Sequence, residues 1–269
     1  MFLNNVENEY VLGSQPMPKV IKNISFSHVY FKYPNSKEFV INDVSFEVNE
    51  NEKIALAGIN GAGKSTLINL LLRFYEPTKG QILINGSDIR VYNLQDYWSC
   101  FSCMFQHSNL YNITLRENLM FGTLDKIGFV NNDALCTFLA SLGINISSDF
   151  LNRQISKQFY EDGLIFSPGQ SQKISVVRTL LNDAPVVVLD EPSSSMDALT
   201  EDSILETAFA FSKSKILFFI SHRLSNLKKV DKIVFLDQGS IIEIGTHEEL
   251  MKNESKYFDL YIKQSNKYL

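Results

Sequence analysis

Long hydrophobic runs are missing from this chain of 269 residues. Its strongest apolar runs, Val186 to Leu189 and Ile216 to Ile220, are far shorter than the roughly 20 residues that a membrane-spanning helix needs. The first ten residues contain no basic region followed by an apolar stretch, so we expect no secretory signal. We therefore expect these residues to fold outside a membrane, which is compatible with their being part of a longer membrane protein.

Cysteine and net charge are also scarce. The three cysteines, Cys100, Cys103 and Cys136, are an odd number in a long chain, which argues against a disulfide scaffold and favours a reducing compartment. The 25 basic and 30 acidic residues give a net charge of −5, so we expect no nucleic-acid partner. Apolar residues make up 45% of the chain, which is enough for a sizeable core in one or two domains of about 150 residues.

The order of apolar patterns predicts an α/β fold. Residues 1–18 are polar and end in two prolines, so we expect a linker there and a folded domain over 19–269. Apolar and polar residues alternate from 20 to 48, as in antiparallel strands. Three short apolar runs are typical of buried parallel strands between helices: 53–57, 186–189 and 216–220.

The remaining segments indicate helices and hairpins. Asn85-Gly86 and Gln238-Gly239 stand between short strand patterns, as hairpin turns do. The spacing predicts helices from Ser65 to about Tyr75 and over 246–267. Residues 107–183 have helical spacing with no strong strand, so we expect a mainly helical part there.

The clearest motif, called the P-loop here, runs from Gly58 to Ser65 and fits G-x-x-x-x-G-K-[ST] in full. Glycines let the backbone wrap so that N–H groups point at phosphate oxygens, and the helix that follows adds its positive end. Lys64 is expected to reach the outer phosphates and Ser65 to hold Mg²⁺. A glycine turn that only links a strand to a helix is the lesser alternative. The predicted nucleotide-binding residues of this segment are Gly58, Asn60, Gly61, Ala62, Gly63, Lys64, Ser65 and Thr66.

Two carboxylates follow the apolar run 186–189. Asp190 and Glu191 stand at the C-terminal end of a predicted strand, where α/β sheets bind ligands. Asp190 is predicted to hold Mg²⁺, directly or through water, and Glu191 to polarise an attacking water. On its own this pattern would indicate a core strand that ends in solvated acids. Beside the P-loop, the catalytic interpretation is favoured.

A third segment completes a resemblance to the nucleotide-binding domains of ABC transporters, which extends from about Val20 to Leu260. This signature segment, Phe166 to Gln170, reads FSPGQ where the family has LSGGQ. In the family it begins a helix whose N-terminus meets the ATP of the other subunit, which assigns Ser167, Gly169 and Gln170 to nucleotide binding. Alone, such a pentapeptide would indicate a plain helix start. The resemblance implies a P-loop NTPase with a RecA-like parallel-sheet core, an N-terminal antiparallel β subdomain and a helical signature subdomain at about 107–183.

Single positions extend the resemblance. Tyr33 matches the aromatic residue that stacks on adenine, and Gln106 matches the loop glutamine that senses Mg²⁺ and faces the membrane subunit. His222 matches the histidine that contacts the γ-phosphate, and residues 194–197 match the loop that runs between two subunits. The ordinary interpretations are an exposed strand tyrosine, a loop amide and a structural histidine. The resemblance implies that Glu191, His222, Lys64 and Gln106 are catalytic and that Ser65, Gln106 and Asp190 hold the metal.

Further stretches point to the exporter branch of the family. Glu161 and Gly163 match part of its GExG motif, and residues 114–118 match T-I-x-E-N. Four positions depart from the pattern: Asn51, Tyr160, Pro168 and Val177. Pro168 replaces the first signature glycine and removes a backbone donor, and Asn51 stands where the family turns on glycine.

The resemblance thus implies a Mg²⁺-dependent ATPase that drives an exporter from the cytoplasmic face of the cell membrane. Two such domains would clamp two ATP molecules head to tail, and residues 1–18 would lead from a transmembrane domain on the same full-length chain. The sequences of the Gln-loop and C-terminal stretches resemble those of bacterial exporters of ribosomal peptides such as lantibiotics. Lipid or drug export is the second candidate. Two further alternatives are a non-transport ABC ATPase that acts on DNA or ribosomes and a regulatory module that holds ATP without turnover.

Overall fold

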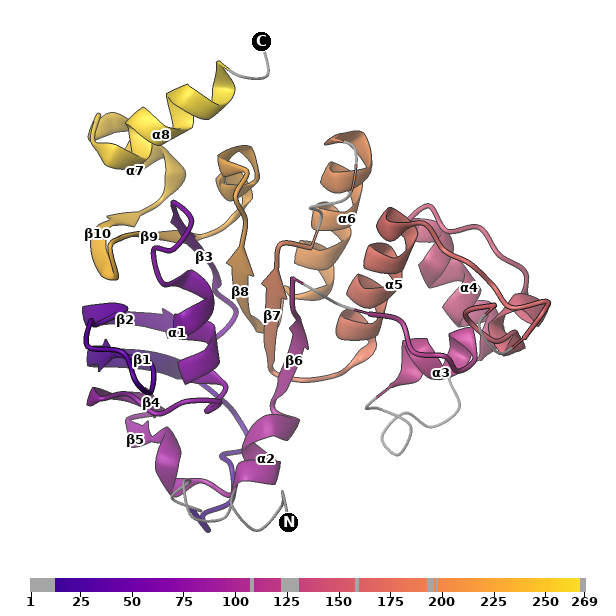
Figure 1. Ribbon diagram of the computed structural model, residues 1–269, viewed down its shortest axis with the longest axis horizontal. Helices are drawn as coiled ribbons and strands as arrows, with labels where there is room; N and C mark the ends of the chain where they lie inside the picture. The colour runs from indigo at the N-terminus through magenta and orange to yellow at the C-terminus, as the bar shows by residue number, and fades with distance from the viewer. Residues whose placement is uncertain are drawn as a thin grey trace. The chain divides into compact units, whose positions relative to one another are not determined.

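The computed structural model describes residues 13–106, 109–121, 131–157, 160–192, 196 and 198–266 (Figure 1). The chain divides into two compact units. The first unit comprises Met1–Phe101, Ala184–Val186 and Ser214–Leu269, and the second comprises Ser102–Asp183 and Val187–Lys213. Among the helices in these described ranges, none combines the length and the apolar character that crossing a membrane requires.

The first unit contains the expected antiparallel sheet. Its strands follow the order β2-β1-β4-β5. They are β1 (Asn23–Phe31), β2 (Ile41–Asn49), β4 (Lys79–Ile84) and β5 (Ser87–Asp88). The buried side chains alternate along β1 and β2, and the rings of Phe26 and Phe46 stack with centroids 4.4 Å apart. Asn85 and Gly86 both have positive φ, which confirms the predicted hairpin turn.

A parallel sheet segment in the same unit carries the P-loop. Strand β3 (Lys53–Gly58) pairs in parallel with β8 (Ile216–Ile220) and with β9 (Lys232–Asp237). Strand β10 (Ser240–Gly245) runs antiparallel to β9 after the predicted hairpin turn. The register places Leu56 beside Ile220, so the chain leaves β3 and β8 at the same edge of the sheet.

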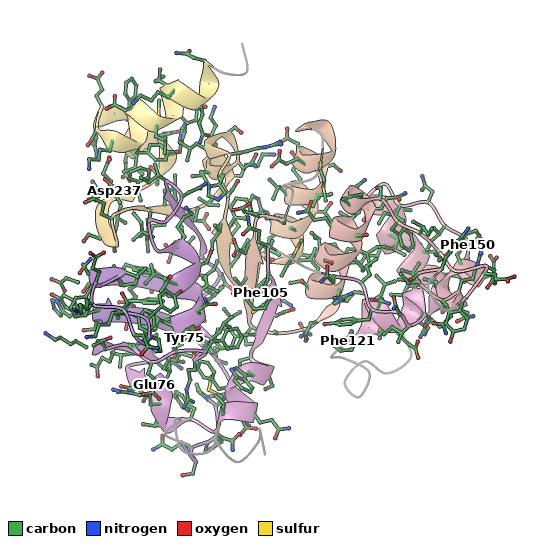
Figure 2. All side chains as sticks on the ribbon, in the orientation of Figure 1. Tyr75, Glu76, Phe105, Phe121, Phe150 and Asp237 are labelled. Atoms are coloured by element: carbon green, nitrogen blue, oxygen red, sulfur yellow. The ribbon has the colours of Figure 1, made fainter. Side chains whose placement is uncertain are left out.

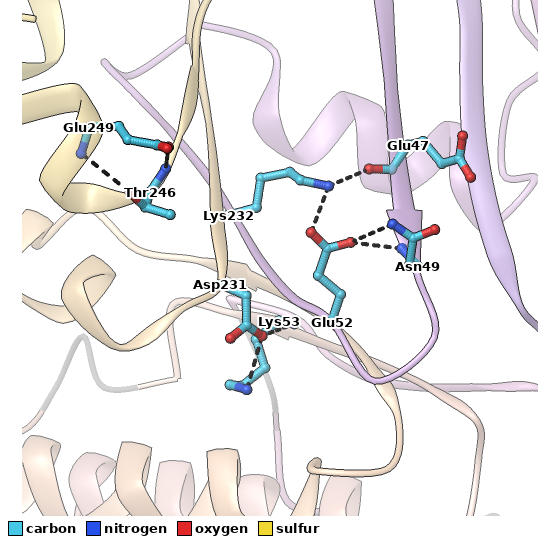
Figure 3. Close-up of polar contacts among 8 residues, drawn as sticks. All are labelled: Glu47, Asn49, Glu52, Lys53, Asp231, Lys232, Thr246 and Glu249. Atoms are coloured by element: carbon cyan, nitrogen blue, oxygen red, sulfur yellow. Dashed lines mark hydrogen bonds and ion pairs between the residues drawn. The ribbon is translucent and has the colours of Figure 1, made fainter.

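Ion pairs fix the beginnings of β3 and β9 (Figure 3). Lys53 Nζ lies 3.0 Å from the Asp231 carboxylate, and Lys232 Nζ lies 2.6 Å from Glu52. Lys232 also donates to the Glu47 carbonyl at 2.9 Å, which ties β9 to β2. These contacts hold the register of the strand whose far end becomes the P-loop.

The helices of the first unit differ in part from the predicted ones. Helix α1 (Lys64–Leu71) ends four residues earlier than expected. Arg73 follows with φ +56, and its buried guanidinium donates to the carbonyls of Ile89 and Tyr92 at 3.0 Å each. Because this side chain folds back into the unit, the helical path does not continue to Tyr75.

The C-terminal part of the first unit also departs from the prediction. The single helix predicted over 246–267 is two helices, α7 (His247–Lys252) and α8 (Lys256–Ser265), separated at Glu254 with φ +47. The short 3₁₀ helices of this unit are η2 (Ile89–Val91) and η4 (Leu224–Lys229), and its helix α2 is Leu94–Ser99.

The second unit is mainly helical. Its strands β6 (Phe101–Met104) and β7 (Val186–Asp190) are neighbours. Its helices are α3 (Leu115–Met120), α4 (Asn132–Ser141), the 3₁₀ helix η3 (Ser148–Asn152), α5 (Pro168–Leu181) and α6 (Ala198–Phe211). The buried run before Asp190 is therefore a strand, as predicted, and the signature segment meets the start of α5.

Part of the predicted linker pairs with a later segment of the first unit. Residues 1–12 lie outside the described residues. Gln15 forms a bridge with Tyr92, and its backbone N–H donates to the carbonyl of Val91 at 3.0 Å. A Cβ on Gly13 would stand 2.2 Å from the backbone of Val91, so this close approach requires glycine.

Candidate functional site

The P-loop needs glycine at two positions for different steric reasons. Gly58 has φ +143, and a Cβ there would stand 2.2 Å from the Leu236 carbonyl oxygen. Gly63 has φ +101, and a Cβ there would stand 2.6 Å from the Ile41 side chain. L side chains rarely adopt such φ values, so the tight wrap of this loop depends on both glycines.

Lys64 is the first residue of α1 and is buried. Its Nζ donates to the carbonyls of Gly58 and Ile59 at 2.9 Å each, which holds the ammonium inside the curve of the loop. Ser65 is exposed in the first turn, where the helix presents its positive end. Of the other predicted loop residues, Asn60 and Gly61 are exposed and Ala62 is buried.

Tyr33 reaches the P-loop helix. Its hydroxyl lies 3.0 Å from Thr66 Oγ1, so one hydrogen bond joins the second residue after β1 to the first turn of α1. The ring of Tyr33 also packs edge-on against the rings of Phe31 and Tyr75, with centroids 5.0 and 5.2 Å away. The Tyr33 ring is thereby held beside the loop, although stacking on adenine remains a prediction.

His222 lies just beyond β8 and is half-buried. Because Leu56 and Ile220 are register partners, the backbone of His222 leaves the sheet at the same edge as Gly58. The first unit therefore brings together Tyr33, the P-loop and His222.

The remaining predicted site residues belong to the second unit. Ser167 is the N-cap of α5: its Oγ accepts from the Gln170 N–H at 3.2 Å, and the Gln170 side chain accepts from the Ser167 N–H at 2.9 Å. Pro168 occupies the first helical position, where proline fits because no intrahelical bond needs its N–H. Gly169 follows it and is half-buried.

Asp190 and Glu191 lie at the end of β7, and Asp190 is buried. Glu191 has φ +51, a strained conformation for a residue with a Cβ. Gln106 Nε2 donates to Glu191 Oε2 at 3.1 Å, and Gln172 Nε2 donates to the Glu191 backbone carbonyl at 3.0 Å. Sequence reasoning missed Gln172 as a site residue, although it lies only two residues after the signature segment.

A second cluster that sequence reasoning missed fixes α5. Arg178 donates to the Asn118 carbonyl at 2.7 Å and to Asn118 Oδ1 at 3.0 Å, and its guanidinium lies over the Tyr111 ring. Burial lowers the pKa of Arg178 from its usual value. Asn118 belongs to α3, and Thr114, the first residue of the exporter-like stretch, caps the N-terminus of this helix. This cluster ties the helix of the signature segment to α3.

The oxygen donors present suit Mg²⁺. The predicted metal residues offer the Ser65 hydroxyl, the Gln106 amide oxygen and the Asp190 carboxylate, which are hard ligands of the kind that Mg²⁺ prefers. The Gln106 amide nitrogen faces Glu191, so its amide oxygen is turned away from that carboxylate. Of the predicted loop 194–197, only Met196 lies within the described residues.

Comparisons with known proteins agree with this geometry. A family model described as ABC transporter matches residues 41–194, which is more than half of the chain. The subtilin transport ATP-binding protein SpaT of Bacillus subtilis is 36% identical over 93% of this chain and 41% of its own length. An ATP-dependent lipid A-core flippase of Idiomarina loihiensis is 33% identical over 93% of this chain and 42% of its own length. A solved bacterial Atm1-family ABC exporter with ATP bound superposes with a TM-score of 0.83 at 28% identity, over 97% of this chain and 46% of that one.

The fold and the P-loop define an α/β P-loop ATPase. Within that class, the chain belongs to the ABC transporter family and is an ATP-binding domain of the exporter type. It spans about two-fifths of the length of the curated relatives that it matches.

Proposed function

We propose that this chain binds and hydrolyses Mg²⁺-ATP as the motor domain of an ABC exporter. The observation that carries the proposal is the P-loop, where glycine-dependent backbone geometry surrounds the ammonium of Lys64 at the start of α1. Lys64 now contacts neutral carbonyls, and phosphate oxygens would give it stronger, charge-assisted hydrogen bonds. The adenine ring would stack on Tyr33.

The chemical step is proposed for three residues. Glu191 would orient the attacking water and accept its proton, and Gln106 would hold one of the Glu191 carboxylate oxygens in place. His222 would donate to the γ-phosphate as charge develops on it. Ser65, Gln106 and Asp190 would hold Mg²⁺, which offsets phosphate charge when bound.

A second ABC ATPase domain is the proposed partner at the site. The capped start of α5 offers the positive end of a 14-residue helix, and this would face the ATP of the partner through Ser167, Gly169 and Gln170. Head-to-tail pairing of two domains would then give two ATP sites. The short span of this chain on its relatives supports a transmembrane domain on the full-length protein and a place at the cytoplasmic face of the cell membrane.

We propose a peptide as the exported substrate. The similarity to a subtilin transport protein supports this choice. Lipid or drug export is the second candidate, which the similarity to a lipid A-core flippase and to a putative multidrug export protein of Bacillus subtilis favours.

The experiment compares the full-length protein with its Glu191→Gln variant. We expect Mg²⁺-dependent ATPase activity that EDTA abolishes and a loss of at least about 100-fold in kcat for the variant, because an amide does not accept the proton. ATP should still bind, and the variant should accumulate as a dimer in size-exclusion chromatography with Mg²⁺-ATP. Glu50→Gln, which changes an exposed acid, is the matched control. A Glu191→Gln variant with the wild-type rate would refute the catalytic role.

A further inference from the structure

The C-terminal helix α8 contacts the loop that carries His222. Gln264 lies near the end of α8, and its side-chain amide makes two hydrogen bonds to this loop. Its Nε2 donates to the His222 carbonyl at 2.8 Å, and its Oε1 accepts from the Leu224 N–H at 3.0 Å. Because both ends of the amide are used, the orientation of the amide is determined and two backbone groups are fixed at once.

The loop also has contacts of its own. Ser221 Oγ accepts from the Arg223 N–H at 3.0 Å, which forms a local turn, and the buried Leu224 begins η4. These contacts define the shape of the loop on either side of His222. Gln264 holds the carbonyl of His222, so the orientation of the peptide plane next to the His222 imidazole depends on α8.

Helix α8 is anchored far from Gln264. Tyr257 is fully buried, and its hydroxyl lies 2.8 Å from His247 Nδ1. Lys256 forms an ion pair with Asp237 at 2.7 Å, at the end of β9, where Figure 2 labels Asp237. These contacts fix the first turn of α8 against β9 and α7. The position of Gln264, two turns further on, follows from that of the helix.

We propose that Gln264 is a positioning residue that sets the direction of the His222 imidazole, so that α8 controls the rate of hydrolysis. The proposal rests on the role proposed above for His222. Fixing the carbonyl of one residue and the N–H of the second residue after it restricts the backbone dihedrals between them. When these hydrogen bonds are removed, a catalytic side chain on that backbone is no longer held in its reactive orientation. Small misplacements of such a side chain lower the reaction rate strongly.

The test uses the full-length protein and three variants. Gln264→Met keeps the size of the side chain but removes both hydrogen bonds, and Gln264→Glu keeps the acceptor for Leu224 but loses the donor to His222. Lys263→Met changes the exposed neighbouring residue and is the matched control. We expect kcat to fall by about tenfold in both Gln264 variants, with KM for ATP unchanged, and the control to behave as wild type.

A second measurement follows the loop without relying on activity. Hydrogen exchange should accelerate at the Leu224 amide in Gln264→Met and stay slow in Gln264→Glu, because only the glutamate retains the acceptor. Wild-type kcat in both variants, with a strongly reduced kcat for His222→Ala, would overturn the proposal and leave the role of His222 intact. A His222→Ala variant with the wild-type kcat would instead refute the role of His222. In the His222→Ala background, Gln264→Met should cause no further loss, and an additive loss would contradict positioning.

Discussion

The two units of the chain hold their predicted site residues by different means. In the first unit the P-loop is held by backbone: parallel strand pairing, glycines at positive φ and two carbonyls around Lys64. In the second unit the predicted residues are held by side chains. Ser167 and Gln170 cap each other, and the amides of Gln106 and Gln172 hold Glu191.

This difference suggests that the P-loop and the residues around Glu191 contribute differently to nucleotide binding and to turnover. A backbone-held loop is already shaped for phosphate, so binding should be robust to changes elsewhere. Glu191 has a strained φ that persists only while its surroundings impose it. We therefore expect substitutions in the P-loop to affect binding and turnover together and substitutions around Glu191 to affect mainly turnover.

The largest expected effect comes from Lys64→Ala in the first unit. The variant loses the cation that is proposed to face the outer phosphates, and each charge-assisted hydrogen bond contributes about 1.5–3 kcal/mol. Nucleotide affinity and kcat should fall together, with affinity reduced by about 100-fold. Titration with a fluorescent ATP analogue and steady-state ATPase measure the two quantities, and Lys213→Ala, at an exposed lysine, is the control. If Lys64→Ala kept the wild-type affinity for nucleotide, the backbone of the P-loop alone would account for nucleotide binding.

The P-loop and the strands around it, which are held by backbone contacts, are also the part that was predicted best from the sequence. Glycine motifs and hairpin dipeptides impose local geometry, so Gly58 and Gly63 in the P-loop and the turn at Gly86 were recognisable from sequence alone. The buried strands β3 and β8 were predicted from short apolar runs because parallel strands are covered on both faces.

Elements that depend on distant contacts were missed. Strand β6 has only four residues and no apolar run, and α2 has six residues and depends on its cap at Asn93. The hydrogen bonds from the side-chain amides of Gln172 and Gln264 join residues that are 19 and 42 positions apart. The strained φ of Glu191 likewise depends on its surroundings in the fold. No local pattern encodes such contacts, so sequence reasoning predicted candidate reacting residues but not the residues that position them.

A middle-sized effect is expected from Gln172→Leu in the second unit. Leucine fills the buried space but leaves the Glu191 carbonyl without this donor, so Glu191 should relax from φ +51. We expect kcat to fall by about tenfold with KM for ATP unchanged, which corresponds to about 1.4 kcal/mol in the barrier. Ser171→Ala, one residue away on α5, is the control for effects on the helix itself. A rise in KM equal to the fall in kcat would contradict the division between the units.

The smallest expected effect comes from Pro168→Gly at the start of α5. Pro168 lies at the first helical position, where it lacks an N–H, and the next donors along the chain are those of Gly169 and Gln170. The Gln170 N–H already donates to Ser167 Oγ at 3.2 Å, so the glycine would supply an additional donor toward the ATP of the partner. Such a donor contributes about 1.5–3 kcal/mol to a charged group.

Proline has an opposing advantage, because it limits the freedom of the unfolded chain by about 0.4–1 kcal/mol and suits this helical position. The added donor is the larger effect, so Pro168→Gly should raise the ATPase rate or leave it unchanged while lowering thermal stability slightly. The rate must be measured at several protein concentrations, because the proposed site requires two subunits. If the rate fell while dimerisation was unchanged, the proline would be the residue that holds the signature segment in its active shape. The start of α5 would then be held by backbone restraint, as the P-loop is, and the contrast between the two units would not extend to the signature segment.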